Sequence, residues 1–253
     1  MKEHIQKTLS DLAENEQIKI LYACESGSRA WGFASPDSDW DVRFIYVNQL
    51  NWYLDLEKKS DTIDLMLPLE LDLGGWDLQK ALRLFASCNL ALYEWINSPK
   101  TYLINSEFHV KIQSLIPSYF SAIKGMHHYL AMANKNFESH LEGTQIKIKK
   151  LFYILRPLLA CEWISNKKIM PPTEYELLLS SSKRLSNDHL DEVLNFMKMK
   201  ETAEEGFLID LSEELIQWIS NEIDYYKNIA RDLPSAKEKG WKPLNQLFID
   251  CVK

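Results

Sequence analysis

The sequence predicts an α+β protein with a sheet-containing domain over residues 1–104 and an all-helical domain over residues 105–253. The first observation is a set of short runs rich in β-branched and aromatic residues, all before residue 105, which are typical of buried strands. The second is apolar spacing of three or four residues from Trp76 onwards, which is typical of helices. The third is the break at Ser98-Pro99, which places the domain boundary near residue 104.

Composition narrows the class of protein. A chain of 253 residues with eight tryptophans can bury a sizeable core, and its net charge of −7 gives no overall basic footprint for nucleic acid. The four cysteines form no Cys-x-x-Cys pair, and no apolar run approaches the ~20 residues that span a bilayer. We therefore expect a cytoplasmic protein with reduced thiols and no membrane contact.

The expected elements of the first domain follow the apolar pattern. Helical spacing predicts a helix over residues 1–16, and a short helix or turn is expected over 29–33. A helix is expected to follow Trp76, and Asn89 is expected to cap a second, short helix after it. Strands are expected over residues 18–23, 40–47, 62–66, 69–73 and 101–104, the fourth of them stopping at Gly74-Gly75.

The second domain is predicted to consist of helices joined by polar connectors, with no fixed repeat. The helical patterns cover residues 106–115, 117–141, 147–163, 173–179, 189–199 and 211–230, and a last apolar turn is expected over 244–252.

The stretch most indicative of chemistry joins the first two strands. Gly27-Ser28 forms a small-residue turn that suits close approach of a phosphate to the backbone. Asp39 and Asp41 stand at the start of the next strand, and residues two apart on a strand point to the same face. Two neighbouring carboxylates are ligands that Mg²⁺ prefers. The pattern therefore indicates a site for a metal-bound polyphosphate.

These residues carry a resemblance. Gly27-Ser28 followed by Ser38-Asp39-Trp40-Asp41-Val42 resembles the signature of the DNA polymerase beta-type nucleotidyltransferase superfamily. One branch, the RlaP-like (YcgL-like) predicted nucleotidyltransferases, is similar over further words: ESGSRAWGF (25–33), DVRFIY (41–46), GWDL (75–78), EW (94–95), SP (98–99) and LRPLLA (155–160). The resemblance implies a nucleotidyltransferase core with a mixed β-sheet, followed by the helical domain.

The resemblance also implies a third carboxylate from a later strand, which completes the metal site and takes the proton of the attacking hydroxyl. Asp64 and Asp72 are the two candidates, with Glu70 a weaker third. Asp72 is favoured if its strand runs antiparallel to residues 40–47, and Asp64 is favoured if the partner is parallel. The sequence leaves both open.

Cations that face the nucleotide are expected from three positions. Arg29 follows the Gly-Ser turn, where it either contacts a phosphate or forms a structural salt bridge. Lys150 and Arg156 lie on the helical pattern 147–163, in a stretch with Lys149, Phe152 and Tyr153, and are candidate ligands of a triphosphate. The alternative for this stretch is a solvated basic face.

The function implied is Mg²⁺-dependent transfer of a nucleoside monophosphate from an NTP to an acceptor hydroxyl. Two Mg²⁺ ions, replaceable by Mn²⁺, are expected, with ATP as the expected nucleotide. RNA ends and protein side chains are the candidate acceptors. The alternatives are a small-molecule acceptor and a non-catalytic nucleotide sensor or toxin–antitoxin-like partner. No Gly-x-x-x-x-Gly-Lys-Ser/Thr loop or Gly-x-Ser-x-Gly elbow is present, which excludes a P-loop kinase and a nucleophile-elbow serine hydrolase.

Overall fold

The computed structural model describes residues 1–204, 206–234 and 240–253. The chain divides into two compact units. The sheet unit comprises Met1–Ala30, Asp39–Tyr119 and Glu238–Lys253, and the helical unit comprises Trp31–Ser38 and Phe120–Lys237. This division differs from the single boundary expected near residue 104, because the chain passes between the units more than once.

The sheet unit is built on a five-stranded mixed sheet with strand order β3-β4-β2-β1-β5. β2 and β4 are parallel, and every other neighbouring pair is antiparallel. The strands are β1 (Lys19–Glu25), β2 (Trp40–Val47), β3 (Thr62–Leu67), β4 (Leu71–Asp77) and β5 (Thr101–Ile104).

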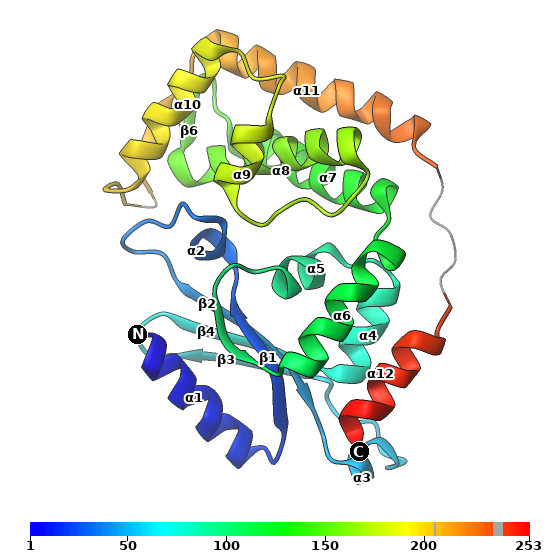
Figure 1. The fold of residues 1–253 in the computed structure, drawn as a ribbon. Helices are drawn as coiled ribbons and strands as arrows, with labels where there is room; N and C mark the ends of the chain where they lie inside the picture. The colour runs from blue at the N-terminus through cyan, green and yellow to red at the C-terminus, as the bar shows by residue number, and fades with distance from the viewer. Residues whose placement is uncertain (205, 235–239) are drawn as a thin grey trace. The chain divides into compact units, whose positions relative to one another are not determined.

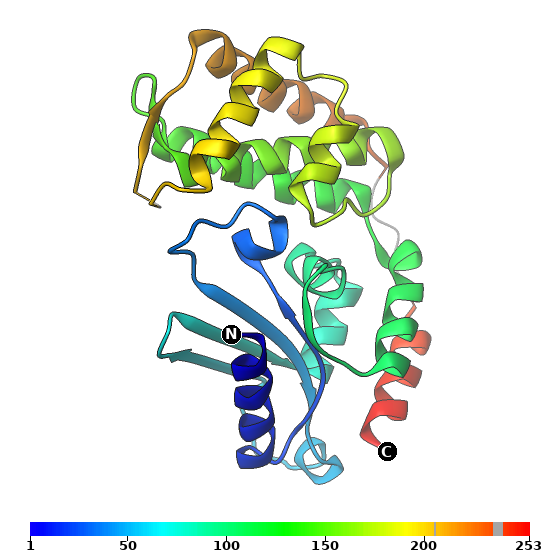
Figure 2. The same cartoon turned by 60° about the vertical axis from the view of Figure 1, so that its left-hand side comes forward.

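Helices cover both faces of this sheet (Figures 1 and 2). On one face, Ile5 and Leu9 of α1 (Lys2–Asn15) pack in a buried apolar cluster with strand residues such as Val42 and Leu73. The helices on the other face are α4 (Leu78–Ala86), α5 (Leu90–Ile96), α6 (Ser106–Tyr119) and α12 (Lys242–Val252). Side chains alternate along a strand, so Asp41 and Asp72, next to Val42 and Leu73, belong to the face opposite α1. The two short helices of the chain's first part are α2 (Gly27–Trp31) and α3 (Leu50–Tyr53).

The described residues of the helical unit form five helices and one small β-ribbon. Its helices are α7 (Ala122–His140), α8 (Ile148–Lys167), α9 (Tyr175–Ser181), α10 (Asn187–Lys200) and α11 (Glu213–Asp232). Its ribbon pairs β6 (Gln145–Lys147) with β7 (Leu208–Asp210) in antiparallel fashion. Gly125 permits the approach of α7 to α8, because a Cβ there would lie 2.9 Å from Ile164 Cδ1. The helical domain expected over residues 105–253 corresponds to this unit only in part, because residues 105–119 and 238–253 belong to the sheet unit.

The expected bounds of two elements were wrong. The strand expected over 69–73 begins later and ends later, because Leu69 and Glu70 have positive φ and form the turn between β3 and β4. β4 then continues through Gly74-Gly75, where a Cβ at Gly75 would lie 2.2 Å from the Phe44 ring, so the glycines mark close packing instead of a break. α6 likewise continues through Pro117, since Ile116 and Tyr119 beside it are buried and offset the lost hydrogen bond.

The predicted cap at Asn89 is present, since its side chain accepts a hydrogen bond from the Leu92 N–H. Within the part of the chain that the structure describes, no helix has both the length and the apolarity needed to cross a bilayer.

Candidate active site

The turn after β1 brings the backbone of Gly27 against the carboxylate of Asp41. Gly27 has φ +59°, and a Cβ at this position would lie 2.2 Å from Asp41 Oδ2. The Ser26 N–H donates to the Asp41 carbonyl over 2.8 Å, which ties the turn to the start of β2. A side chain at position 27 is therefore excluded both by its backbone conformation and by the neighbouring carboxylate.

Parallel pairing of β2 with β4 places Asp41 opposite Asp72. The Arg43 guanidinium joins the two carboxylates: its Nη2 lies 3.1 Å from Asp41 Oδ1 and 2.7 Å from Asp72 Oδ2. Its Nη1 donates to the Asp72 carbonyl over 3.0 Å. Gly74 leaves room for this side chain, because a Cβ there would lie 3.1 Å from Arg43 Cδ. Arg43, Asp41 and Asp72 thus form a partly exposed cluster, here called the carboxylate cluster.

The third carboxylate candidates differ in position. β4 is parallel to β2, the arrangement under which Asp64 was expected, yet Asp72 is the one beside Asp41. The physical reason is the late start of β4, which puts Asp72 at its beginning and level with the beginning of β2. Asp64 lies on the edge strand β3, opposite Gly74, and is exposed. Glu70 lies in the turn before β4, where its carbonyl accepts from the Trp40 N–H over 2.9 Å.

Asp39 and Arg29 lie at the edge of the carboxylate cluster. Asp39 is exposed just before β2, and its side chain makes no hydrogen bond or ion pair with a described residue. Its carbonyl accepts from Arg29 Nε over 3.0 Å, and the Arg29 guanidinium stacks on the Trp40 ring at 3.8 Å. Arg29 is therefore held by an aromatic face and a backbone carbonyl.

Glu25, at the end of β1, is a site residue that the sequence reading missed. It is fully buried, its Oε1 accepts from the Asp41 N–H over 2.9 Å, and its Oε2 accepts from the Tyr102 hydroxyl. Burial raises the pKa of the Glu25 carboxyl, while its hydrogen bonds to Tyr102 and to the Asp41 backbone act in the opposite direction. A carboxylate ending an otherwise apolar strand directly before Gly27-Ser28 was the available signal. Its contacts assign it to holding the Asp41 backbone in place.

Lys150 and Arg156 belong to α8 in the helical unit, where their environments differ. Lys150 is half-buried, with its Nζ 5.6 Å from the centre of the Tyr153 ring. Arg156 is 0% exposed; its guanidinium stacks on Trp31 at 4.4 Å, and its Nε donates to the Thr173 carbonyl over 3.1 Å. Such burial does not fit a phosphate ligand and assigns Arg156 to the packing of the helical unit.

The segment Trp31–Ser38, which links the Gly-Ser turn to Asp39, is held by the same unit. Phe33 packs in an aromatic cluster with Phe152 and Tyr175, at ring-centre distances of 5.1 and 5.4 Å. Lys200, at the end of α10, is 1% exposed and donates to Ser35 Oγ over 2.6 Å. The segment between the two halves of the motif is thus packed into the helical unit through its buried side chains, such as Phe33 and Ser35.

The donor atoms of the carboxylate cluster suit a divalent metal. No group of three or more His, Cys, Asp or Glu side chains among the described residues is already gathered closely enough to hold an ion. Asp41 and Asp72 nevertheless share one cationic nitrogen, that of Arg43, between their oxygens. The two carboxylates therefore converge on a place that a cation occupies, and hard oxygen ligands are those that Mg²⁺ prefers.

This mixed sheet, with a Gly-Ser turn next to paired aspartates, together with the family match over residues 1–250, defines a DNA polymerase beta-type nucleotidyltransferase. Within that class, the chain belongs to the RlaP family, described as "RNA repair pathway DNA polymerase beta family". The resemblance stated from the sequence is thereby confirmed.

Two individual proteins are similar to the chain. The uncharacterised protein YcgL of Bacillus subtilis (strain 168) is 36% identical over 254 residues, which cover 100% of this chain and 97% of that protein. The crystal structure of a nucleotidyltransferase-like protein from Exiguobacterium sibiricum 255-15 aligns with 92% of this chain and 75% of that one, at 12% identity and a TM-score of 0.34.

Proposed function

We propose that the protein catalyses Mg²⁺-dependent transfer of a nucleoside monophosphate from an NTP, with ATP the expected donor, to a hydroxyl at an RNA end. The observation that carries the proposal is the convergence of Asp41 and Asp72 on one cationic nitrogen beside the Gly27 backbone. The RNA acceptor is preferred over a protein side chain because the family description names an RNA repair pathway.

In this proposal, Asp39, Asp41 and Asp72 hold two Mg²⁺ ions. The ions would supply charge neutralisation for the triphosphate and would lower the pKa of the acceptor hydroxyl. The chain's own residues would provide position: the Gly27 turn would present backbone N–H groups to the phosphates, whereas Ser28, whose hydroxyl was expected to join them, is only 4% exposed. Glu25 fixes the Asp41 backbone through its hydrogen bond. Little covalent chemistry is left to the protein, so positioning and charge supply most of the catalysis.

Arg43 favours a second candidate, a nucleotide sensor without turnover. The Arg43 guanidinium, with one positive charge between Asp41 and Asp72, already offsets part of the negative charge of the two carboxylates in the absence of metal. A protein that kept the fold for binding alone would gain stability from that arrangement. Nucleotide binding without metal-dependent release of pyrophosphate would identify this function.

The proposed reaction is tested by incubating the protein with each α-³²P-labelled NTP and Mg²⁺ or Mn²⁺, with total RNA and with cell lysate. We expect a labelled RNA band that Asp41→Asn and Asp72→Asn each reduce by at least 100-fold, whereas the matched variant Asp64→Asn keeps it. A labelled protein band would transfer the proposal to a protein acceptor. Absence of label with NTP binding intact would support the sensor or a small-molecule acceptor. Loss of label in Asp64→Asn but not in Asp72→Asn would overturn the assignment of Asp72.

A further inference from the structure

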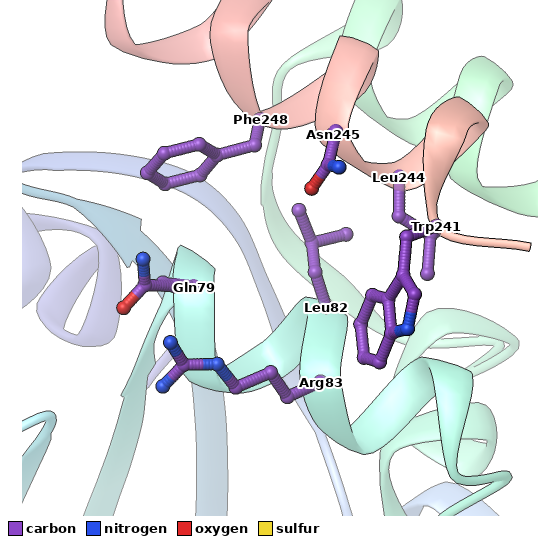
Figure 3. Close-up of a pocket in the computed structure, with 7 residues that line it drawn as sticks. All are labelled: Gln79, Leu82, Arg83, Trp241, Leu244, Asn245 and Phe248. Carbon is purple, nitrogen blue, oxygen red and sulfur yellow. The ribbon is translucent and has the colours of Figure 1, made fainter.

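A cavity lies between α4 and α12 in the sheet unit, separate from the carboxylate cluster (Figure 3). α12 contributes residues at spacings of three and four, so that they lie on one face of the helix. α4 contributes the residues on the opposite side of the cavity. The rings of Trp241 and Phe248, from the α12 side, point towards opposite ends of the cavity. The lining residues are Gln79, Leu82, Arg83, Trp241, Leu244, Asn245 and Phe248.

Among the described residues, none offers a hydrogen-bond or ion-pair partner to the polar side chains of this cavity. The Arg83 guanidinium makes no hydrogen bond or ion pair with any described residue, and the same holds for the side-chain amides of Gln79 and Asn245. Trp241 is 51% exposed, and its indole contacts no aromatic ring among the described residues. The lining thus offers one positive charge, two amides and a large aromatic face to a ligand.

The cavity volume limits the size of that ligand. Its volume is ≈ 240 Å³, larger than the ~150 Å³ cavity that accommodates benzene and below the ~300–1,000 Å³ of sites for drug-sized ligands. One heterocyclic ring system fits, with any charged substituent outside the cavity near Arg83. Aromatic rings stack on bases, amides bond to base edges, and arginine pairs with phosphate. These groups together match one unpaired nucleotide.

We propose that the cavity between α4 and α12 binds one unpaired nucleotide of a single-stranded RNA. The base would stack on Trp241, and its phosphate would pair with Arg83. The choice of RNA rests on the proposed function. If the end of an RNA acceptor reacts at the carboxylate cluster, the nucleotides behind that end must contact another part of the protein surface. Net charge −7 gives the protein little general attraction for RNA, so that a local site has to supply the affinity.

The topology of the sheet unit predicts how long that RNA must be. Asp72 begins β4 and Gln79 follows its end at the start of α4, and both belong to the face opposite α1. At ~3.3 Å per strand residue the separation along β4 is about 20 Å. A stacked strand advances ~3.4 Å per nucleotide, so roughly six nucleotides are needed to occupy both places.

The first experiment measures binding without chemistry. Fluorescence anisotropy of a fluorescein-labelled 12-nucleotide RNA of mixed sequence is followed in EDTA, without NTP, at several salt concentrations. We expect Trp241→Ala to weaken binding 5- to 100-fold and Trp241→Phe to restore it to within about threefold. We expect Arg83→Gln to reduce the slope of log Kd against log salt by about 0.7, the value of one lost phosphate contact. Arg231→Gln, which replaces an exposed arginine of the helical unit, is the matched control with an unchanged slope.

Several outcomes would overturn the proposal. These are absence of RNA binding by the full-length protein, or equal binding by the wild type, Trp241→Ala and Arg83→Gln. Competition by AMP or UMP as tight as that of the RNA would show a mononucleotide site instead. Because Trp241 and Arg83 are exposed, unchanged thermal melts are expected and confirm that a binding loss is not unfolding.

The second experiment joins the site to the reaction. If RNA is the acceptor, Trp241→Ala is expected to raise KM for a 12-nucleotide acceptor at least fivefold and to leave KM for a 4-nucleotide acceptor unchanged. Equal effects on both lengths would overturn the predicted path. If no acceptor is labelled at all, the proposed function fails, while the anisotropy experiment still decides whether the cavity binds RNA.

Discussion

At the scale of single residues, the candidate active site depends on two glycines whose missing side chains leave space for neighbouring charged side chains. Gly27 accommodates the Asp41 carboxylate, and Gly74 accommodates Arg43. Both glycines stand where sequence analysis favours a turn or a break, but their contacts show that they make space for the carboxylate cluster. The chemistry of this site therefore constrains positions that carry no functional group.

Gly27→Ala is expected to abolish most nucleotidyl transfer. The new Cβ would collide with Asp41 Oδ2, and a positive φ costs a non-glycine residue about 1–3 kcal/mol. Gly32→Ala is the matched control: Gly32 also has a positive φ, +94°, but a Cβ there meets nothing within 4 Å. Thermal melts and the transfer assay separate the two effects. Equal loss of activity in both variants would assign the defect to backbone strain alone.

Arg43→Gln is expected to increase the affinity for Mn²⁺ by about threefold to tenfold. Removing a positive charge from between two carboxylates strengthens their attraction for a divalent cation, and the pair is only partly screened because Arg43 is 20% exposed. Titration calorimetry with Mn²⁺, without nucleotide, gives the affinity directly. Weaker binding would mean instead that Arg43 holds the carboxylates in the orientation that the metal needs.

The part of the candidate site that could be predicted from the sequence consists of residues close together in the chain. Gly27-Ser28 and Asp39-Trp40-Asp41 lie close in sequence, so strand alternation alone predicted that the carboxylates act together. The roles of Arg43 and Asp72 depend on the register of β2 against β4, which pairs Asp41 with Asp72, and on the start of β4 directly after the turn at Leu69 and Glu70. A positive φ at a leucine cannot be predicted from the apolar pattern. The sequence therefore did not decide whether Asp64 or Asp72 is the third carboxylate.

At the scale of elements, α8 shows how a charged residue can belong to a core. Its apolar pattern predicted the helix correctly, whereas Arg156 inside that run was expected to be a phosphate ligand or part of a solvated basic face and is instead buried. Its partners, Trp31, Tyr129 and Thr173, are distant in sequence, so their aromatic and carbonyl contacts were not predictable. Helices and strands could be predicted because their periodicity is local. Contacts between residues distant in the sequence could not, because they depend on the topology of the fold.

Arg156→Lys is expected to lower the melting temperature without changing KM for NTP. A lysine cannot reproduce the planar stacking on Trp31 or the Nε hydrogen bond to Thr173, a loss of about 2–3 kcal/mol. At roughly 2–4 °C per kcal/mol, this corresponds to about 5–10 °C. Lys150→Gln is the companion variant. If Lys150 contacts a phosphate, this change raises KM for NTP and leaves the melting temperature unchanged. A raised KM in Arg156→Lys would restore the phosphate role of Arg156.

At the scale of the whole molecule, ligand binding is expected to appear as thermal stabilisation. Metal and NTP at 100 times Kd stabilise a folded protein by about 2.7 kcal/mol, or about 5–10 °C here. Differential scanning fluorimetry with MnATP should show this shift in the wild type and in Asp64→Asn, and EDTA should remove it. Asp41→Asn should show less than a third of the shift. A full shift in Asp41→Asn would contradict the placement of the metal.

The segment Trp31–Ser38 also has a consequence for biosynthesis. It leaves the ribosome early, but Phe152, Tyr175 and Lys200, which bury it, are made more than a hundred residues later. At ~5–20 residues per second, its aromatic side chains lack their partners for on the order of ten seconds. The nascent chain thus exposes these aromatic side chains, between Gly27-Ser28 and Asp39, until the helical unit has been made.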